Sequence, residues 1–228
     1  MLRRDDAASF FLFYLDNSKN WSIFAAGMRK ILLTIMVVLG CFACETKDHG
    51  PNFGTEEECL YDGMQLKGQW EKIVNEASAS PVQSLACTKV VQLAQYRLGL
   101  AGKEAIGYCL SNTKEVITSV TAAMMMSDVY IQLGYPSLAE RAAFEAMVKT
   151  SDEALKQRAL QRLTETAIIT RQYEVARKYL FILEEKGANR QWLQTMKRMA
   201  EQPATIQENP TFKNLQEQYD NTEDQFFM

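Results

Sequence analysis

Histidine is almost absent from this chain of 228 residues, and the single one, His49, lies in a polar stretch rich in Gly, Pro and Asn. A catalytic histidine needs a fixed geometry with a nucleophile or a base, which such a flexible stretch does not supply. The sequence also lacks a GxSxG, HExxH, Walker or dinucleotide-binding motif. We therefore expect a protein that is not an enzyme and that uses no cofactor.

Clusters of basic residues are missing as well. No block of Lys and Arg follows residue 30, and the net charge of the chain is −3. Nucleic-acid binding needs such clusters to neutralise phosphates, so we exclude it. CxxC patterns are absent. The Glu run at 56–58 and the Met run at 124–126 point to different sides of a helix, so neither run converges on an ion, and we expect no metal site.

Cysteine is scarce, with five residues in the chain. Cys41 and Cys44 fall in an apolar segment, and the spacing of Cys59, Cys87 and Cys109 matches no dense disulfide scaffold. We interpret the last three mainly as small buried residues. Whether one pair of them forms a disulfide stays open.

Proline occurs only five times, and each proline lies where a boundary between helices is expected. Strand signals are scarce between these boundaries, and helical periodicity dominates. We divide the chain into five parts: an upstream extension (1–27), a lipoprotein signal peptide or membrane anchor (28–41), a flexible tether (42–55), a helical repeat domain (56–202), and a C-terminal helix and tail (203–228).

The segment 28–44, MRKILLTIMVVLGCFAC, resembles the start of a secreted protein although it lies inside the chain. Arg29 and Lys30 precede an uncharged run, and Gly40 stands directly before Cys41. This order of basic, apolar and small residues is typical of a secretory signal. The run is also shorter than the about 20 apolar residues that span a membrane.

The residues VLGC at 38–41 resemble a bacterial lipobox, which implies acylation of Cys41, with Cys44 as the alternative. In this interpretation Met28 is the true start and residues 1–27 are an upstream extension. The lipid then anchors the protein to a membrane of the bacterial cell envelope, with the helical domain outside the cytoplasm.

A single membrane-spanning segment is the alternative, formed by joining residues 21–27 to the apolar run. It places Arg29 and Lys30 within the membrane, where a charged residue costs roughly 2.5–3.5 kcal/mol on insertion scales. This cost favours the lipoprotein interpretation.

An internal repeat of two helices follows the tether. Aligning the second helices of four units places a small or aliphatic core residue at spacings of 32, 34 and 37, at Ile73, Ala105, Ala139 and Ala176. Nine residues earlier stand Met64, Tyr96, Tyr130 and Ala167. Gly68 and Gly134 precede the second helix at the same offset. Small residues let two helices approach closely, and several units must stack because one unit cannot bury its own apolar face.

A repeat near 34 residues with two helices per unit resembles the tetratricopeptide pattern. The resemblance covers roughly residues 56–186 and implies an all-α fold, an α-solenoid of about four helical hairpins. The second unit departs from the pattern, since Gly102 stands where an aromatic residue is usual. We expect two C-terminal capping helices, one capped by Asn189 and one beginning at Pro210. An ordinary helical bundle is the competing interpretation.

Three stretches, YDGMQLKGQWEKIV, LGYPSLAERAAFEAM and RQYEVARKYLFILEE, resemble the C-terminal part of a family of uncharacterised Bacteroidetes envelope proteins. Longer members carry several membrane spans before a similar helical region, and here the apolar run at 31–44 stands in their place. The resemblance implies a location and a fold, and no activity.

A groove lined by first helices is the binding surface that the tetratricopeptide resemblance implies. Its register selects Arg97, Met124, Asp128, Ile131, Gln132, Arg158, Glu165 and Ile168. An apolar floor with scattered charge suits an extended or helical peptide, although a merely solvated face is the alternative. We expect Arg97→Glu and Asp128→Arg to weaken binding and to leave the melting temperature nearly unchanged.

Two functions follow from these features. The first is a lipid-anchored envelope protein whose helical scaffold binds an envelope protein or peptide segment. The second is a structural accessory subunit of a membrane complex, anchored by a single transmembrane segment and packing through its C-terminal helices against a membrane partner.

We predict that the mature chain begins at an acylated Cys41. Intact-mass analysis of the membrane-extracted protein should give a chain that starts at this residue and carries lipid. A chain that retains residues 28–40 without lipid would contradict the prediction.

Overall fold

The computed structural model describes residues 54–221, so both candidate lipidation sites, Cys41 and Cys44, lie outside the described residues. The upstream extension, the anchor and most of the tether lie outside them too. Within 54–221 the chain forms ten α-helices and one 3-10 helix, and no strand. The expected all-α fold is therefore confirmed for this part of the chain.

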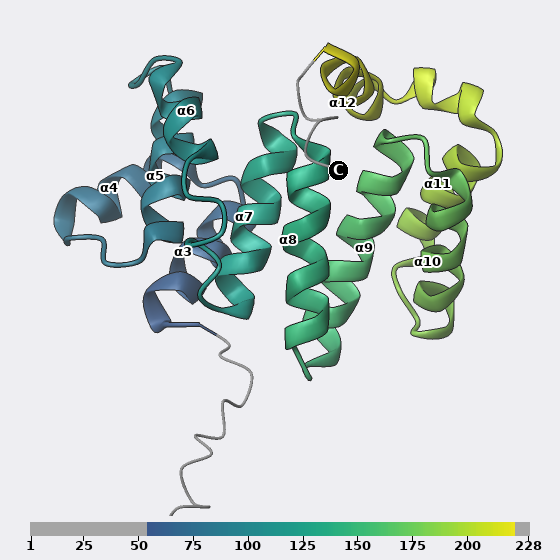
Figure 1. Cartoon of the computed structure of the whole chain (residues 1–228), viewed down its shortest axis with the longest axis horizontal. Coiled ribbons are helices and arrows are strands. Elements are labelled where there is room, and N and C mark those ends of the chain that lie inside the picture. Colours follow the sequence, from purple (N-terminus) through teal and green to yellow (C-terminus); the bar gives the residue numbers. More distant parts are fainter. Residues whose placement is uncertain (1–53, 222–228) are drawn as a thin grey trace, which may run out of the picture. The chain divides into compact units, whose positions relative to one another are not determined.

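Four helical hairpins follow one another, and each packs on the next (Figure 1). Their helices are α3 (Glu56–Leu66) with α4 (Trp70–Ala79), α5 (Leu85–Arg97) with α6 (Glu104–Leu110), α7 (Val120–Gln132) with α8 (Pro136–Lys149), and α9 (Glu153–Ile169) with α10 (Tyr173–Glu185). Three elements then close the array: α11 (Arg190–Glu201), the 3-10 helix η1 (Pro203–Glu208) and α12 (Pro210–Asn221). The consecutive packing is that of an α-solenoid.

One turn geometry recurs between the two helices of a hairpin. Gly68 and Gly134 have φ angles of 63° and 84°, which glycine adopts without steric cost. The amide of the next residue donates to a carbonyl five residues back, with distances of 3.0 Å from Gln69 to Met64 and 2.9 Å from Tyr135 to Tyr130. The aligned sequence positions are thus equivalent in space.

The second hairpin departs from this geometry, as its sequence indicates. Gly99 has a φ angle of 71°, and Leu100 donates to the carbonyl of Gln95, so the turn is anchored one residue before the aligned Tyr96. The following helix, α6, has only seven residues. This unit is held instead by Lys89, whose fully buried Nζ donates to the carbonyl of Cys109 at 3.1 Å. Burial lowers the pKa of Lys89.

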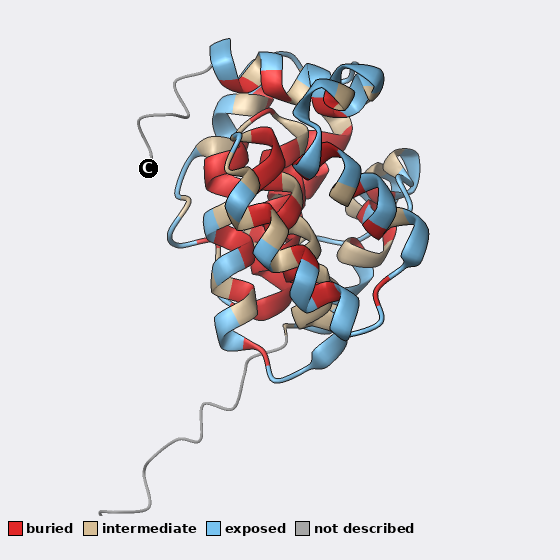
Figure 2. Cartoon of the chain, turned by 90° about the vertical axis from the view of Figure 1, so that its right-hand side faces the viewer, coloured by how far each residue is buried: buried red, intermediate tan, exposed pale blue. Residues whose placement is uncertain are grey.

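Small side chains lie where the paired helices cross. The four aligned positions, Ile73, Ala105, Ala139 and Ala176, all have an exposed fraction of 2% or less. At Ala139 the approach is close enough for Ser127 Oγ of α7 to donate to its carbonyl at 2.8 Å. Buried residues gather where neighbouring helices face each other, and exposed ones follow the outer sides (Figure 2). The expected role of small residues is confirmed.

One carboxylate joins the N-terminal ends of α3, α5 and α7, each of which is the first helix of its hairpin. Glu58 accepts a hydrogen bond from the backbone of Thr55, the N-cap of α3, at 3.1 Å. It also accepts from the hydroxyls of Ser84 and Ser119, which precede α5 and α7, at 2.8 Å and 2.7 Å. Helix N-termini favour negative charge, so this buried side chain is stabilised by three of them. Glu58 of the acidic run at 56–58 therefore acts at helix N-termini.

The expected ends of the two C-terminal helices are confirmed. Asn189 caps α11 through a 3.0 Å bond from the Trp192 amide, and Pro210 begins α12. All three residues of the Met run at 124–126 are fully buried. Cys59, Cys87 and Cys109 are free thiols in the described part of the chain. Cys87 and Cys109 are buried as expected, whereas Cys59 is exposed, so the expectation that it is a buried residue was wrong. Burial raises the pKa of Cys87 to about 12 and that of Cys109 to about 11, so both stay protonated at neutral pH.

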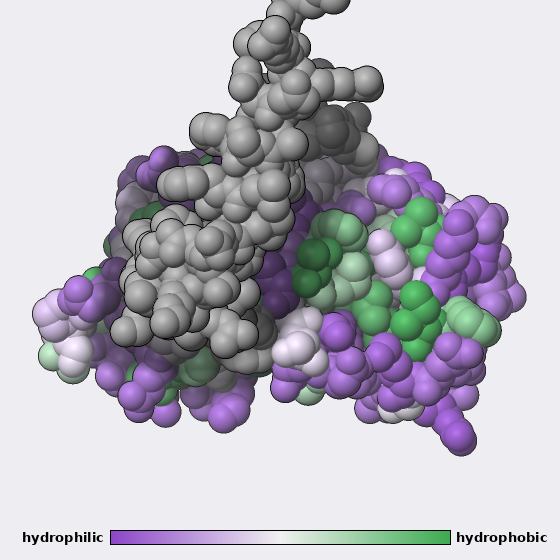
Figure 3. All heavy atoms as spheres, turned by 60° about the horizontal axis from the view of Figure 1, so that its bottom comes forward, coloured by the Kyte–Doolittle hydropathy of each residue, from purple (hydrophilic) through white to green (hydrophobic). Residues whose placement is uncertain are grey.

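The outer surface of the array mixes polar and apolar side chains (Figure 3). Large exposed apolar residues are Leu60, Leu66, Leu100, Tyr108, Phe144, Val148, Phe181 and Ile182. Between residues 54 and 221 no helix has the length and apolar character to cross a membrane.

We predict that Ala139→Leu lowers the free energy of unfolding by about 1–3 kcal/mol, because its added atoms must enter a close-packed helix crossing. Urea denaturation of both chains measures the difference. Ala154→Leu, at an exposed position near the start of α9, is the control and should change stability by less than about 0.5 kcal/mol. Equal stability of the Ala139→Leu variant and the parent would contradict the close crossing.

Candidate functional site

Two arginines of α9 join three first helices of the array. Arg158 makes a bidentate ion pair with Asp62 of α3, with both distances 2.7 Å. It also contacts Asp128 of α7 at 2.6 Å, and Arg162 contacts the other oxygen of Asp128. On its own helix Arg162 pairs with Glu165 at 2.7 Å. We call these five residues the arginine–carboxylate network.

The network is largely removed from water. The exposed fractions of its side chains are 6% for Asp128, 14% for Asp62, and 20% and 21% for Arg158 and Arg162. Burial alone would lower the pKa of Arg158, but the hydrogen bonds and charges of Asp62 and Asp128 raise it above its ordinary value. Both arginines therefore stay charged, and each needs its partners.

The network extends to the closing helix. Glu165 accepts a hydrogen bond from the indole Nε1 of Trp192 on α11 at 3.4 Å. Burial raises the pKa of Glu165, although Arg162 and Trp192 oppose the shift. Side chains from α3, α7, α9 and α11 thus form one connected polar group along the first helices.

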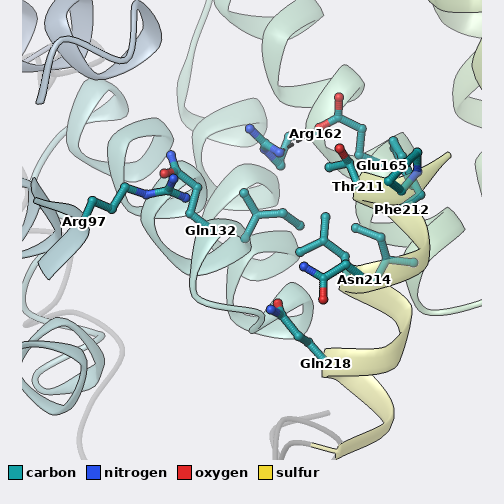
Figure 4. A pocket seen from close by; sticks show the side chains of 12 residues that line it. Arg97, Gln132, Arg162, Glu165, Thr211, Phe212, Asn214 and Gln218 are labelled. Carbon is teal, nitrogen blue, oxygen red and sulfur yellow. Dashed lines mark hydrogen bonds and ion pairs between the residues drawn. The ribbon is translucent and has the colours of Figure 1, made fainter. Parts of the chain in front are cut away.

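A cavity of about 600 Å³ lies beside this network, at the C-terminal ends of α5, α7 and α9. α12 forms its other wall. Its lining residues are Arg97, Ile131, Gln132, Arg162, Glu165, Ile169, Pro210, Thr211, Phe212, Asn214, Leu215 and Gln218. Figure 4 shows Arg97 directed toward Gln132 from one side, and Asn214 and Gln218 entering from α12 on the other.

Three buried polar atoms on this lining have no hydrogen-bond partner among the described residues. They are Gln132 Oε1 of α7, Arg162 Nε of α9 and Gln218 Oε1 of α12. A buried polar atom without a partner costs roughly 1–3 kcal/mol. Three side chains around the cavity therefore carry hydrogen-bonding capacity that the described residues do not use.

Arg97 contributes an available positive charge at the edge of the cavity. The residue is exposed, and its guanidinium carbon lies 5.2 Å from the centre of the Trp70 ring. No ion pair to Arg97 occurs within residues 54–221, in contrast to the arginines of the network. The aromatic ring orients the guanidinium and leaves its charge uncompensated.

The eight residues expected to line a groove fall into three groups. Arg97, Ile131, Gln132 and Glu165 line the cavity. Asp128 and Arg158 belong to the arginine–carboxylate network. Met124 and Ile168 have no exposed surface.

The expectation for Met124 and Ile168 therefore needs correction, because both lie in the core and not on the floor of a groove. Asp128 also differs from the expected free charge, since two arginines neutralise it. Reversing its charge would break the network, so the Asp128→Arg variant does not test binding alone.

Two residues of the arginine–carboxylate network, Asp62 and Arg162, were not selected from the sequence, and neither was any cavity residue of α12. Arg158, Arg162 and Glu165 are spaced i, i+4, i+7 on α9, and this spacing places them on one helical face. From this spacing, Arg162 could have been identified as a neighbour of Arg158 and Glu165. Asp62 lies 96 residues from its partner Arg158, and no sequence pattern links the two. Among the described residues, no group of three His, Cys, Asp or Glu has a geometry that holds a metal ion.

These features define an all-α array of helical hairpins with a cavity at the ends of its first helices. The chain belongs to DUF6057, a family of unknown function, which it matches over residues 6–228. The comparisons with curated proteins and with solved structures gave no match. The family match includes the apolar run at 31–44 together with the whole helical array.

We predict that Asp128→Ala lowers the free energy of unfolding by about 2–4 kcal/mol, because two partly buried guanidinium groups lose a counter-charge. The matched control is Glu208→Ala, which removes an exposed ion pair with Arg198 and should cost less than about 1 kcal/mol. Urea denaturation measures both variants. Equal, small effects of the two substitutions would show that the network does not hold the first helices together.

Proposed function

We propose that the protein is a lipid-anchored protein of the bacterial cell envelope whose helical domain is a non-catalytic scaffold. In this proposal the domain lies outside the cytoplasm and binds a segment of another envelope protein. The tetratricopeptide-like character of the hairpins is part of the proposal. It is supported by the turn geometry that Gly68 and Gly134 share.

The observation that carries the proposal is the cavity at the ends of α5, α7 and α9. It is open to the surface, has about 600 Å³ of space, and combines an apolar wall with unpaired polar atoms. Binding sites for small ligands and short peptide segments have this size and mixture. Because the first helices are held by the arginine–carboxylate network, the site is preformed and avoids part of the ordering cost of association.

Selectivity in this proposal comes from Arg97. Its uncompensated charge beside the cavity favours a partner segment with an acidic side chain or carboxylate. An exposed charge of this kind adds more to partner choice and association rate than to affinity. The charges of Asp128 and Arg158 are already paired within the protein and add little to such selectivity.

A structural accessory subunit, anchored by a single transmembrane segment, is the second candidate. The family match begins at residue 6, ahead of the basic pair at 29–30. This observation favours a protein in which the apolar run has translated residues before it, as an internal membrane segment does. In that case the C-terminal helices contact a membrane partner, and Arg97 is not required.

We predict that Arg97→Glu reduces capture of the partner protein from detergent-solubilised envelopes by about tenfold, because attraction of an acidic segment becomes repulsion. Quantitative mass spectrometry of the captured proteins measures the loss. Arg141→Glu, an exposed arginine of α8 that does not line the cavity, is the control and should retain the partner.

Melting temperatures of both variants should stay close to that of the parent, because neither arginine belongs to the network. Full retention of every partner by Arg97→Glu would rule out the cavity as the binding surface. Loss of all partners on deletion of residues 203–228, with no effect of Arg97→Glu, would instead support the accessory subunit.

A further inference from the structure

α12 lies across the ends of two hairpins, where α7 turns into α8 and α9 into α10 (Figure 1). It buries Phe212, Gln216 and Tyr219, which share one helical face with the half-buried Leu215. The side chain of Gln216 donates to the carbonyl of Ile168 at the end of α9, at 3.0 Å. The helix thus docks on the array through a defined apolar face.

A hollow that is open to the surface lies between α12 and the array. Its volume is about 600 Å³, so α12 leaves part of the surface on which it lies uncovered. The unpartnered atoms of Gln132, Arg162 and Gln218 lie on its two walls. A helix in place of α12 that filled this space and paired Gln132 and Arg162 of the array would fit the array better than α12 does.

The ion pair that ties α12 to the array is exposed. Arg171, in the turn after α9, binds Asp220 of α12 through two bonds of 2.8 Å and 2.7 Å. The exposed fractions of the two side chains are 45% and 47%, and ion pairs in such surroundings add little stability. This ion pair therefore orients α12 on the array but adds little free energy to its attachment.

Arg171 also occupies a position that favours glycine. Its φ angle is 64°, and its place in the turn is that of Gly68 and Gly134 in the other hairpins. A side chain in this left-handed conformation is strained, so an arginine here has a cost that glycine avoids. In the structure its guanidinium forms the ion pair with Asp220 of α12.

The connection to α12 has the form of a hinge. η1 ends at Glu208, Asn209 is extended with φ −106° and ψ 103°, and Pro210 begins α12. A proline start and an Asn cap define α12 as a separate rigid unit, since Asn209 accepts from the amides of Thr211 and Phe212. A rotation at Asn209 would therefore move α12 as one body.

We propose that the surface beneath α12 is a docking site for an amphipathic helix of a partner protein, and that α12 is the resident helix which this partner displaces. The inference rests on the proposed function and specifies its partner. The partner helix carries apolar residues at the spacing of Phe212, Leu215 and Tyr219, and an acidic residue at the place of Asp220. A larger apolar side chain toward the cavity gives it an advantage over α12.

The test uses the full chain and a labelled synthetic peptide with the sequence of residues 209–221 as a stand-in for the partner helix. The Asp220→Arg chain loses the tie between its own α12 and Arg171, while the peptide keeps its Asp and pairs with the freed Arg171. We expect the peptide to bind this variant about threefold to fivefold more tightly than the parent, because loss of an exposed ion pair raises the open fraction modestly and the apparent Kd falls as that fraction rises. Fluorescence anisotropy measures the Kd values.

Two variants of the full chain are controls. Glu217→Arg makes the same charge change on an exposed residue of α12 that pairs with Lys213 and not with Arg171, and it should leave peptide binding at the parental level. Arg171→Glu repels Asp220 of the peptide and should weaken its binding to the Asp220→Arg chain when the two substitutions are combined. Equal binding by the parent and the Asp220→Arg chain, or no binding to either, would show that α12 is a fixed part of the fold.

Dimerisation of the Asp220→Arg chain would also overturn the proposal, because the occupant would then be α12 of a second copy. Sedimentation of the variant at the concentrations of the binding assay decides this point. The experiment needs no envelope partner, so a failed capture through Arg97 leaves it unaffected. Conversely, absence of peptide binding leaves the cavity's role in capture to be judged by Arg97→Glu alone.

Discussion

The arrangement of the first helices depends on two guanidinium groups that are shared among three carboxylates. Arg158 and Arg162 of α9 contact Asp62 of α3 and Asp128 of α7, and Glu165 completes the set on α9 itself. Charges that have lost most of their water are tolerated only when their partners are in place. We therefore infer that the network selects the relative placement of α3, α7 and α9 among the similar ones that apolar packing alone tolerates.

The two ends of the first helices differ in how they are completed. At the N-terminal ends of α3, α5 and α7, the carboxylate of Glu58 binds all three helix starts and is fully satisfied. At the C-terminal ends of α5, α7 and α9, α12 covers a cavity and leaves polar atoms of Gln132 and Gln218 unpaired. This arrangement suits the proposed binding. The array held by the arginine–carboxylate network keeps the docking surface formed, while α12 is replaced by the partner helix.

The helical hairpins were predictable from the sequence because their determinants are local. Small residues such as Ala139 recur at a fixed period, and Gly134 marks the turn five residues before it. The groove was predicted less well, since a helical face also depends on which charges find partners. Asp128 looked like a surface charge until Arg162 was placed against it, and Met124, one helical turn earlier, proved to be core. The site of α12 rests on a contact between distant segments, which no periodic pattern encodes.

Hydrogen exchange of the backbone amides in the full chain tests the central claim most directly, namely that a rigidly held array carries an exchangeable last helix. The account predicts that α12 opens with a free energy at least about 2 kcal/mol below that of α7 and α9, so its amides exchange first and as one group. It also predicts that α3, α7 and α9 exchange together, because the arginine–carboxylate network links them. Equal protection of α12 and α9 would contradict the account.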